Sequence, residues 1–340
     1  MLSNKIKKII FLGALFLPFW ASAQFLGSDS SLYVKIDPKF PKPNQEFSVS
    51  IESYVTDLNL AETSWFKNGT LVEKGFGLNS FTFKAGGLGS SVKINIQVKT
   101  SNKGTLTKII EITPAEVDLF WEANSSVPPL YKGKALSSYQ SDIKIIAVPN
   151  FIDSNGYFLN SKDLIYRWKK DMRAIGDSSG IGRNVLILKD NKIPSNQTIS
   201  VEVETKDGKM LAGGNLNVVY SRPEIVFYEK NPLLGVVYEK ALETPFILTE
   251  EEASIVAQPF FFSKDDIFNG NLVYKWLIDN KEIEEAQGDN IMTLRRPEKG
   301  SGSINLNLGI TNFNRIMQFA NNQLKINLGE LKGSNLFNNI

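Results

Sequence analysis

The sequence predicts an all-β protein built from three tandem antiparallel β-sandwich modules that follow a signal peptide. Three observations lead to this prediction. A tryptophan-bearing strand recurs three times, each copy is followed by strands of alternating apolar and polar residues, and the chain opens with an apolar leader. The repeat period of slightly over 100 residues is longer than a solenoid unit, so each copy should be a domain with its own core.

The first 23 residues have the pattern of a signal peptide. Three lysines precede an apolar run from Ile9 to Trp20, and a small-x-small sequence ends at Ala23. The run is shorter than the roughly 20 apolar residues that a membrane span needs. We therefore expect cleavage before Gln24 and export to the periplasm, the cell surface or the medium. An uncleaved N-terminal anchor is the alternative, and no later stretch is apolar enough to span a membrane.

The composition excludes several classes of function. The chain has no cysteine and no histidine, which rules out disulfides, a lipid-modified cysteine, histidine-dependent nucleophilic catalysis and the usual zinc sites. Without the three leader lysines the formal net charge changes from +2 to −1. A nearly neutral chain without a basic cluster argues against a nucleic-acid partner. We expect no cofactor, and the sequence leaves the oligomeric state open.

Each predicted module carries one tryptophan in an alternating strand that leads into a polar turn. Trp65, Trp168 and Trp276 are 103 and 108 residues apart, and an Asn or Asp stands three positions after each. Asn and Asp tolerate the positive φ that a tight hairpin turn requires. Because the tryptophans lie inside alternating strands, we interpret them as structural core rather than as sugar-stacking platforms.

Two further alternating strands follow each tryptophan strand. They are predicted at residues 81–83, 185–188 and 291–294, and then at residues 92–98, 199–203 and 304–308. Strict alternation places one face of a strand in a core and the other in water. A proline follows Thr113 and another follows Arg222, where it resists continuation of a strand ladder. The predicted modules are residues 24–113, 114–222 and 223–340.

The second and third modules share a leader that the first lacks. Residues 115–121 match residues 223–228, and residues 131–136 match residues 238–242. Neighbouring aromatic residues in a strand cannot all face one core, so at least one must meet a partner or the adjoining module. The same holds for a separate aromatic run at residues 260–262, within another predicted strand. The candidate protein-binding residues from the leaders and this run are Phe120, Trp121, Phe227, Tyr228, Phe260 and Phe261.

The aromatic-x-Trp strand, the polar turn and the two strands after it resemble bacterial immunoglobulin-like and polycystic-kidney-disease (PKD)-type domains. The resemblance implies immunoglobulin-like (PKD-like) sandwiches of about seven strands with the tryptophan buried between the sheets. It also implies a role as a spacer, an adhesive module or a subunit of a surface assembly. PKD-type domains usually continue into an Asp-Phe-Gly-Asp-Gly turn, which residues 66–69 and their counterparts lack, so the subfamily stays open.

Two oxygen-rich loops precede the second and third tryptophan strands, at residues 153–156 and 265–271. Calcium takes six to eight oxygen ligands, but neither loop has the glutamate that ends an EF-hand loop. Asp, Asn, Ser and Gly are also the ordinary residues of turns. A calcium site is therefore a hypothesis of second rank beside a plain loop.

Two acidic clusters, at residues 250–252 and 282–285, raise the question of catalysis. Paired carboxylates can hydrolyse glycosides when a cleft holds them about 5–10 Å apart. Nothing in the sequence fixes these residues across a cleft, and such runs usually lie on solvated faces. We expect a non-enzymatic envelope or surface protein that acts as an adhesive, scaffold or pilus-associated component. The alternatives are a carbohydrate-binding surface protein and, after it, a carboxylate-dependent hydrolase.

Overall fold

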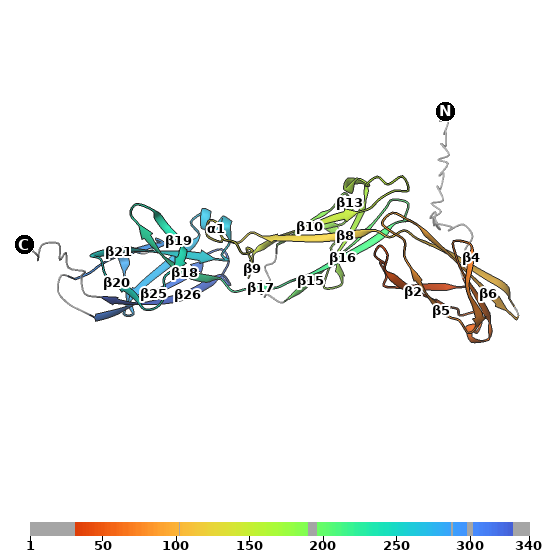
Figure 1. Ribbon diagram of the computed structural model, residues 1–340. Helices are drawn as coiled ribbons and strands as arrows, with labels where there is room; N and C mark the ends of the chain where they lie inside the picture. Colours follow the sequence, from red (N-terminus) through yellow and green to blue (C-terminus); the bar gives the residue numbers. More distant parts are fainter. Residues whose placement is uncertain (1–30, 102, 190–195, 287, 298–301, 329–340) are drawn as a thin grey trace, which may run out of the picture. The chain divides into compact units, whose positions relative to one another are not determined.

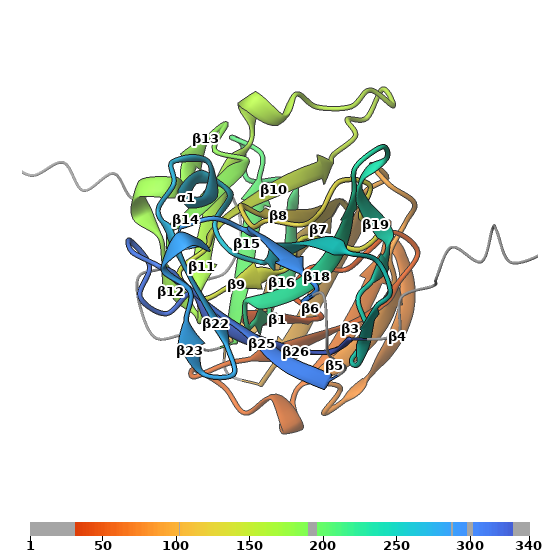
Figure 2. The same ribbon diagram turned by 90° about the vertical axis from the view of Figure 1, so that its left-hand side faces the viewer.

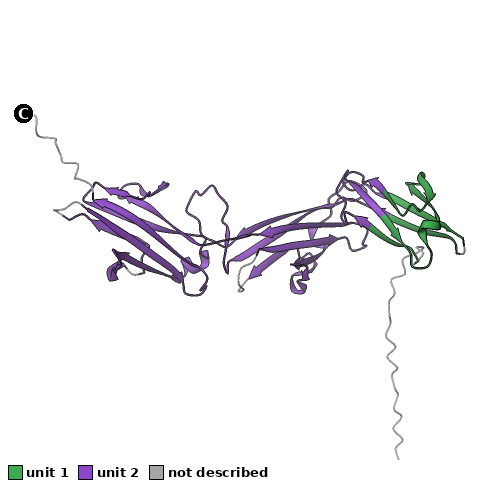
Figure 3. Cartoon of the chain, turned by 90° about the horizontal axis from the view of Figure 1, so that it is seen from below, with its two compact units in different colours: residues 1–35, 50–81, 93–110 green, residues 36–49, 82–92, 111–340 purple. Residues whose placement is uncertain are grey.

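The computed structural model describes residues 31–101, 103–189, 196–286, 288–297 and 302–328 (Figure 1). The predicted signal peptide and the predicted mature start at Gln24 lie outside these residues. One compact unit comprises residues 1–35, 50–81 and 93–110, and the other comprises residues 36–49, 82–92 and 111–340 (Figure 3). The three module boundaries remain a prediction.

The strands between residues 33 and 112 form two sheets, with the orders β1-β2-β5 and β4-β3-β6-β7. Their bounds are β1 (Tyr33–Asp37), β2 (Glu46–Glu52), β3 (Glu62–Lys67), β4 (Thr70–Phe76), β5 (Ser80–Lys84), β6 (Val92–Thr100) and β7 (Gly104–Ile112). A short 3-10 helix at Leu58–Leu60 precedes β3. Trp65 on β3 is paired with Ile96 on β6.

The next group of strands forms what we call the second sandwich. It contains β8 (Glu116–Ala123), β9 (Ser137–Ser138), β10 (Asp142–Asn150), β11 (Ile165–Lys170), β12 (Arg173–Ala174), β13 (Gly180–Ile181), β14 (Val185–Lys189), β15 (Gln197–Glu204), β16 (Leu211–Val218) and β17 (Tyr220–Ser221). The sheets β14-β10-β8 and β12-β11-β15-β16 enclose a core that includes Ile145, Trp168 and Val201. Strands β9 and β17 pair in parallel.

The third sandwich repeats this arrangement. It contains β18 (Glu224–Asn231), β19 (Gly235–Ala241), β20 (Phe246–Leu248), β21 (Glu252–Phe260), α1 (Lys264–Phe268), β22 (Leu272–Ile278), β23 (Lys281–Glu282), β24 (Ile291–Arg295), β25 (Gly302–Asn312) and β26 (Phe319–Leu328). The sheets β19-β18-β21-β24 and β20-β26-β25-β22-β23 enclose a core around Trp276. Figure 2 shows β18, β19, β22, β25 and β26 of these sheets from the side that lies at the left in Figure 1.

The strand order is that of an immunoglobulin-type sandwich. In the second sandwich β8, β10 and β14 take the places of strands A, B and E, and β11, β15 and β16 take the places of C, F and G. The other two groups of strands show the same A-B-E and C-F-G neighbours. The prediction of an all-β fold with antiparallel immunoglobulin-like sheets is confirmed.

The three tryptophans occupy equivalent positions and are fully buried. Each indole N–H donates to a backbone carbonyl in the segment before strand E: Trp65 to Leu78 at 3.2 Å, Trp168 to Arg183 at 2.8 Å and Trp276 to Asp289 at 2.8 Å. A buried indole thereby keeps a partner for its one polar group.

The predicted turns after the tryptophan strands are hairpins with positive φ at both central residues. The φ angles are 50° and 85° at Asn68-Gly69, 48° and 65° at Asp171-Met172, and 48° and 66° at Asp279-Asn280. Two left-handed residues in succession match the right-handed twist of the flanking strands. The prediction of Asn and Asp as turn residues is confirmed.

Candidate binding surfaces

The structure separates the six candidate aromatic residues. Phe227 points into the core of the third sandwich, where its ring centroid lies 5.9 Å from that of Trp276. Only 2% of Phe227 is exposed. Alternation along β18 sends Phe227 inward and its neighbour Tyr228 outward. Phe227 is therefore core, which corrects its proposal as a binding residue.

Tyr228, Phe260 and Phe261 are also buried, on the other side of the same sheet. The ring of Phe260 makes an edge contact with Tyr131 at 5.6 Å, and Tyr228 makes one with Tyr238 at 5.2 Å. Because Tyr131 belongs to the segment after β8, the second sandwich helps to cover this cluster. We name Tyr228, Phe260 and Phe261 the joint cluster. Of the two neighbours that the sequence allowed for these aromatic residues, a partner or the adjoining module, the cluster meets the adjoining sandwich. It is therefore not free to bind a partner in this structure.

Backbone hydrogen bonds join the two sandwiches beside the joint cluster. The amide of Ser126 donates to the carbonyl of Phe262 at 2.7 Å, and the amide of Phe261 donates to the carbonyl of Ser126 at 2.7 Å. Ser125 and Ser263 form an isolated antiparallel bridge. The linking segments thus pair as short strands would, which restricts their motion relative to each other.

A buried ion pair anchors the loops of the third sandwich. Asp266 on α1 is 5% exposed and accepts a hydrogen bond from Arg315 Nε at 2.7 Å. The amides of Asn271, Asn312 and Asn314 donate to the same carboxylate at 3.0–3.1 Å. Arg315 lies in the loop between β25 and β26, so the network fixes that loop against α1.

The same loop binds the second sandwich. Gln318 is fully buried, and its Nε2 donates to the carbonyl of Tyr139 at 2.8 Å and to Ser138 Oγ at 3.2 Å. Arg315 Nη1 donates to the carbonyl of Gln140, and the amide of Met317 donates to Gln140 Oε1 at 3.0 Å. We name Asp266, Arg315, Met317 and Gln318, together with Ser138, Tyr139 and Gln140, the polar joint. Buried polar groups that are all paired define one arrangement of the two sandwiches.

The sequence did not reveal the polar joint, because its members are far apart along the chain. Asp266 and Arg315 are 49 residues apart, and Gln318 and Ser138 are 180 apart. The one available signal was the polar loop at residues 265–271, which the sequence suggested for calcium. In the structure the carboxylate of Asp266 is occupied by Arg315 and three amides, so this loop is an ion-paired anchor.

The other suggested calcium loop forms a tight turn. Asp153 Oδ1 accepts hydrogen bonds from the amides of Asn155 and Tyr157, both at 2.9 Å. The hydrogen bond from Tyr157 is the main reason that the pKa of Asp153 lies below its ordinary value. Among the described residues, no three His, Cys, Asp or Glu side chains converge as metal ligands would. The carboxylate of Asp153 is thus held by the amides of its own turn.

The polar joint makes stability depend on pH. Burial by itself would raise the pKa of Asp266. The hydrogen bonds from Asn314, Asn312, Arg315 and Asn271 together outweigh this effect and hold the pKa well below its usual range. A carboxyl whose pKa is depressed on folding contributes stability above its unfolded pKa of about 4, and this contribution disappears as the pH falls below that value.

We therefore expect the wild-type protein to lose more stability than Asp266→Asn between about pH 6 and pH 3. Urea unfolding at a series of pH values measures the difference. Equal pH dependence in the two proteins would show that Asp266 is not ionised in the polar joint.

Phe120 remains exposed and belongs to an apolar row on the outer face of the second sandwich. It pairs across β8 and β10 with Ile146, which pairs with Val185 on β14. Phe120 is 60% exposed, and Val148 and Ile187 extend the same face. We name Phe120, Ile146 and Val185 the outer row.

The corresponding faces elsewhere are polar at the position of Ile187. The alternating strands at residues 81–83 and 291–294 place Thr82 and Thr293 there. Thr82 hydrogen-bonds Ser48 at 2.9 Å, and Thr293 hydrogen-bonds Ser254 at 2.9 Å. The fold itself therefore does not require an apolar residue at this position.

Trp121 points away from the outer row and packs against the core of the second sandwich. The ammonium group of Lys134 lies 3.3 Å from the centre of its ring, a cation–π contact. Burial lowers the pKa of Lys134. Trp121 is thus half-buried and already has a partner within the chain.

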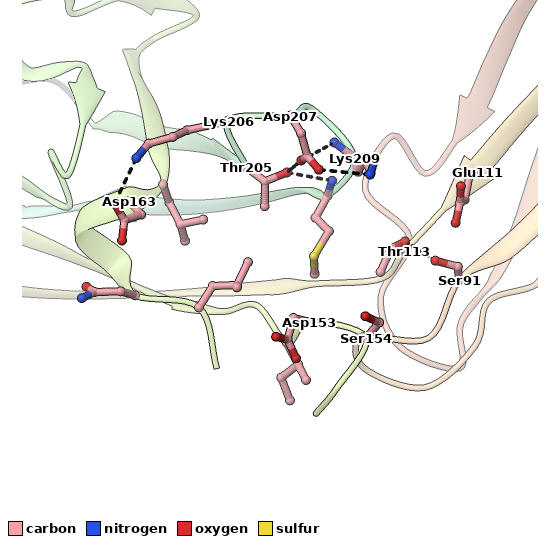
Figure 4. Close-up of a pocket in the computed structure, with 16 residues that line it drawn as sticks. Ser91, Glu111, Thr113, Asp153, Ser154, Asp163, Thr205, Lys206, Asp207 and Lys209 are labelled. Carbon is pink, nitrogen blue, oxygen red and sulfur yellow. Dashed lines mark hydrogen bonds and ion pairs between the residues drawn. The ribbon is translucent and has the colours of Figure 1, made fainter. Parts of the chain in front are cut away.

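A pocket of about 560 Å³ lies beside the loop that joins β15 and β16 (Figure 4). Asp207 accepts a hydrogen bond from Thr205 at 2.6 Å and pairs with Lys209 at 3.4 Å, while Lys206 reaches Asp163 at 3.0 Å. Both lysines that line the pocket are thus neutralised by aspartates. None of the lining residues is aromatic, so the pocket offers no stacking surface for a sugar.

The acidic clusters lie on exposed ends of elements in the third sandwich. Glu252 begins β21 and pairs with Arg295 at 2.7 Å, and Glu282 on β23 pairs with Lys275 at 2.6 Å. These are surface ion pairs of the kind that contributes little to stability.

None of the helices within the described ranges has the length and apolar character needed to cross a bilayer.

No protein-family model and no curated protein matches the sequence. Solved structures that match include the three N-terminal domains of the outer capsid protein Hoc of bacteriophage RB49, at 10% identity and a TM-score of 0.27, covering 89% of this chain and 99% of that one. The central fibronectin-III array of RIM-binding protein matches at 10% identity and a TM-score of 0.28, with coverages of 89% and 99%. The glucan-utilization protein SGBP-B of Bacteroides ovatus, solved with a mixed-linkage heptasaccharide, matches at 11% identity and a TM-score of 0.22, with coverages of 89% and 72%. The strand order of the sheets, rather than these weak likenesses, establishes the fold.

Proposed function

We propose that this protein is an exported, non-enzymatic binding protein of the cell envelope, acting as an adhesive, scaffold or pilus-associated accessory component through protein–protein contacts. The observation that carries the proposal is the exposed outer row on the second sandwich. Its three residues lie in register on three adjacent strands and form one continuous apolar face.

The outer row has the properties of a binding surface. Burying a side chain such as Phe contributes about 1.5–3 kcal/mol, and large aromatic residues dominate the energetics of many interfaces. The Glu122–Lys144 ion pair, at 3.3 Å, lies beside the row on the same face. An apolar centre with a charged rim is the usual anatomy of a protein interface.

The polar joint supports a role that depends on a fixed arrangement of surfaces. A flexible connection between sandwiches would need few contacts, whereas this one buries Gln318, Asp266 and the joint cluster. Fixing the third sandwich against the second would present the outer row in a constant orientation relative to the third sandwich.

A cross-linking pull-down from native envelopes with the mature chain, residues 24–340, tests the proposal. We expect capture of envelope proteins by the wild type and loss of at least nine-tenths of that capture in Phe120→Ser. Phe268→Ser is the matched control, because Phe268 is 91% exposed and belongs to α1 of the third sandwich rather than to the outer row. Thermal unfolding should show that both variants remain folded.

Recovery of no protein, or equal capture by wild type and Phe120→Ser, would contradict the proposal. A glycan array with the same three proteins would then test the carbohydrate-binding alternative.

A further inference from the structure

The edge of the second sandwich next to the outer row is an open strand. Strand β8 is the last strand of the sheet β14-β10-β8. The amide of Asn124 donates to the carbonyl of Asp142, which fixes the alternation of hydrogen bonds along β8 and β10. The backbone groups of Leu119, Trp121 and Ala123 therefore point away from β10, toward the open side.

The two halves of this edge, Glu116–Asp118 and Leu119–Ala123, differ in what lies beside them. Near its start β8 runs close to β16, so that a Cβ added to Gly214 would lie 3.0 Å from the carbonyl oxygen of Val117. The carbonyl of Val117 thus faces a covered side. From Leu119 to Ala123, by contrast, no strand of the described residues pairs with β8 on that side.

The third sandwich has the same edge with a strand already in place. There β19 pairs with the second half of β18, and the amide of Leu242 donates to the carbonyl of Phe227 at 2.8 Å. The leaders align Phe227 with Leu119 and Tyr228 with Phe120. Tyr238 of β19 covers Tyr228, which is 7% exposed where Phe120 is 60% exposed.

The second sandwich uses the equivalent segment elsewhere. Residues 131–136 match residues 238–242 in sequence, and Tyr131 matches Tyr238. Instead of returning along β8, this segment places Tyr131 against Phe260 and Leu136 against the joint cluster. The segment that matches β19 therefore packs against the third sandwich, and it does not form a strand beside β8.

We propose that the second half of β8 accepts an extended strand from a different protein, in the way that β18 accepts β19. This inference rests on the proposed function and names the chemistry of the partner. The strand would carry an apolar residue and an aromatic residue two positions apart, as Val236 and Tyr238 do, so that both pack on the outer row. Main-chain hydrogen bonds to Leu119 and Trp121 would supply affinity, and the two side chains would supply specificity.

A second copy of this chain is a poorer donor. Its own β19 is paired with β18, and its own Tyr131 segment is packed on the joint cluster. Donation of either one would uncover apolar surface in the donor, which a separate protein with a free strand avoids.

The test uses a synthetic peptide of residues 234–242 as the probe, because this sequence already forms the equivalent strand. Titration into the isotope-labelled mature protein should give saturable amide shifts at Leu119, Trp121 and Ala123. Phe120→Ser should weaken binding at least tenfold, and Phe268→Ser should leave it unchanged. A peptide with Tyr238→Ser should also bind at least tenfold more weakly.

Each outcome decides between the claims. No shifts on β8, or shifts that persist unchanged in Phe120→Ser, would overturn strand addition. If a partner is nevertheless captured through Phe120, the proposed function stands without it. Peptide binding without capture of any envelope protein would support the open edge and overturn the proposed function. A concentration-dependent dimer of the mature chain that Phe120→Ser abolishes would overturn the choice of a different protein as the donor.

Discussion

Replacing Arg315 by methionine should destabilise the protein by about 3–5 kcal/mol, since removal of one partner of a buried ion pair leaves the buried carboxylate of Asp266 without its counter-ion. The side chains of Arg315 and Asp266 are 18% and 8% exposed, and their closest atoms are 2.7 Å apart. The substitution also removes the hydrogen bond to the carbonyl of Gln140, and with it part of the connection to the second sandwich. Methionine retains most of the side-chain volume, so the effect measures charge and hydrogen bonding rather than a cavity.

The matched control is Arg295→Met. Arg295 also pairs with a carboxylate, that of Glu252, at 2.7 Å, but its side chain is 83% exposed. Exposed pairs contribute about 0–1 kcal/mol, so this variant should lie close to the wild type. Urea unfolding measures both variants. Equal effects would mean that the buried pair is no stronger than a surface pair, and the polar joint would then not determine how the two sandwiches are held.

Trp168→Ala should cost about 3–5 kcal/mol, the range found when a large buried aromatic side chain is truncated. The indole of Trp168 lies in the centre of the second sandwich, where it is 0% exposed. Its N–H donates to the backbone carbonyl of Arg183. The substitution leaves a cavity between the sheets and an unpaired carbonyl. Both effects act on the folded state.

Trp121→Ala is the control for this prediction, because Trp121 is only half-buried. It should lose part of its packing and the contact with Lys134, an interaction of about 0.5–2 kcal/mol. Circular dichroism during urea unfolding follows both variants without relying on tryptophan fluorescence. A cost for Trp168→Ala no greater than that for Trp121→Ala would contradict the assignment of Trp168 to the core.

The outer row and the joint cluster show where sequence reasoning about the candidate site stopped. The leaders of the second and third modules align Phe120 with Tyr228, and the sequence predicted that at least one aromatic residue of each leader faces away from the core. Both do, but Tyr228 is covered and Phe120 is not. The difference arises because the segment after β18 returns along its own sandwich, whereas the matching segment after β8 packs on the next one. The resemblance between the two segments did not reveal that difference, since both run from a Tyr to Ala-Leu, with three residues between at 131–136 and two at 238–242.

The sequence by itself determined the features that depend on neighbouring residues. Alternation predicted the strands around Trp65, Trp168 and Trp276, because side chains of a strand alternate between two faces. The Asn and Asp residues after them predicted the hairpin turns, because few residues tolerate positive φ. Only the tertiary structure decided the polar joint and the open edge of β8. Their partners lie tens to more than a hundred residues apart, and only folding of the backbone brings them together.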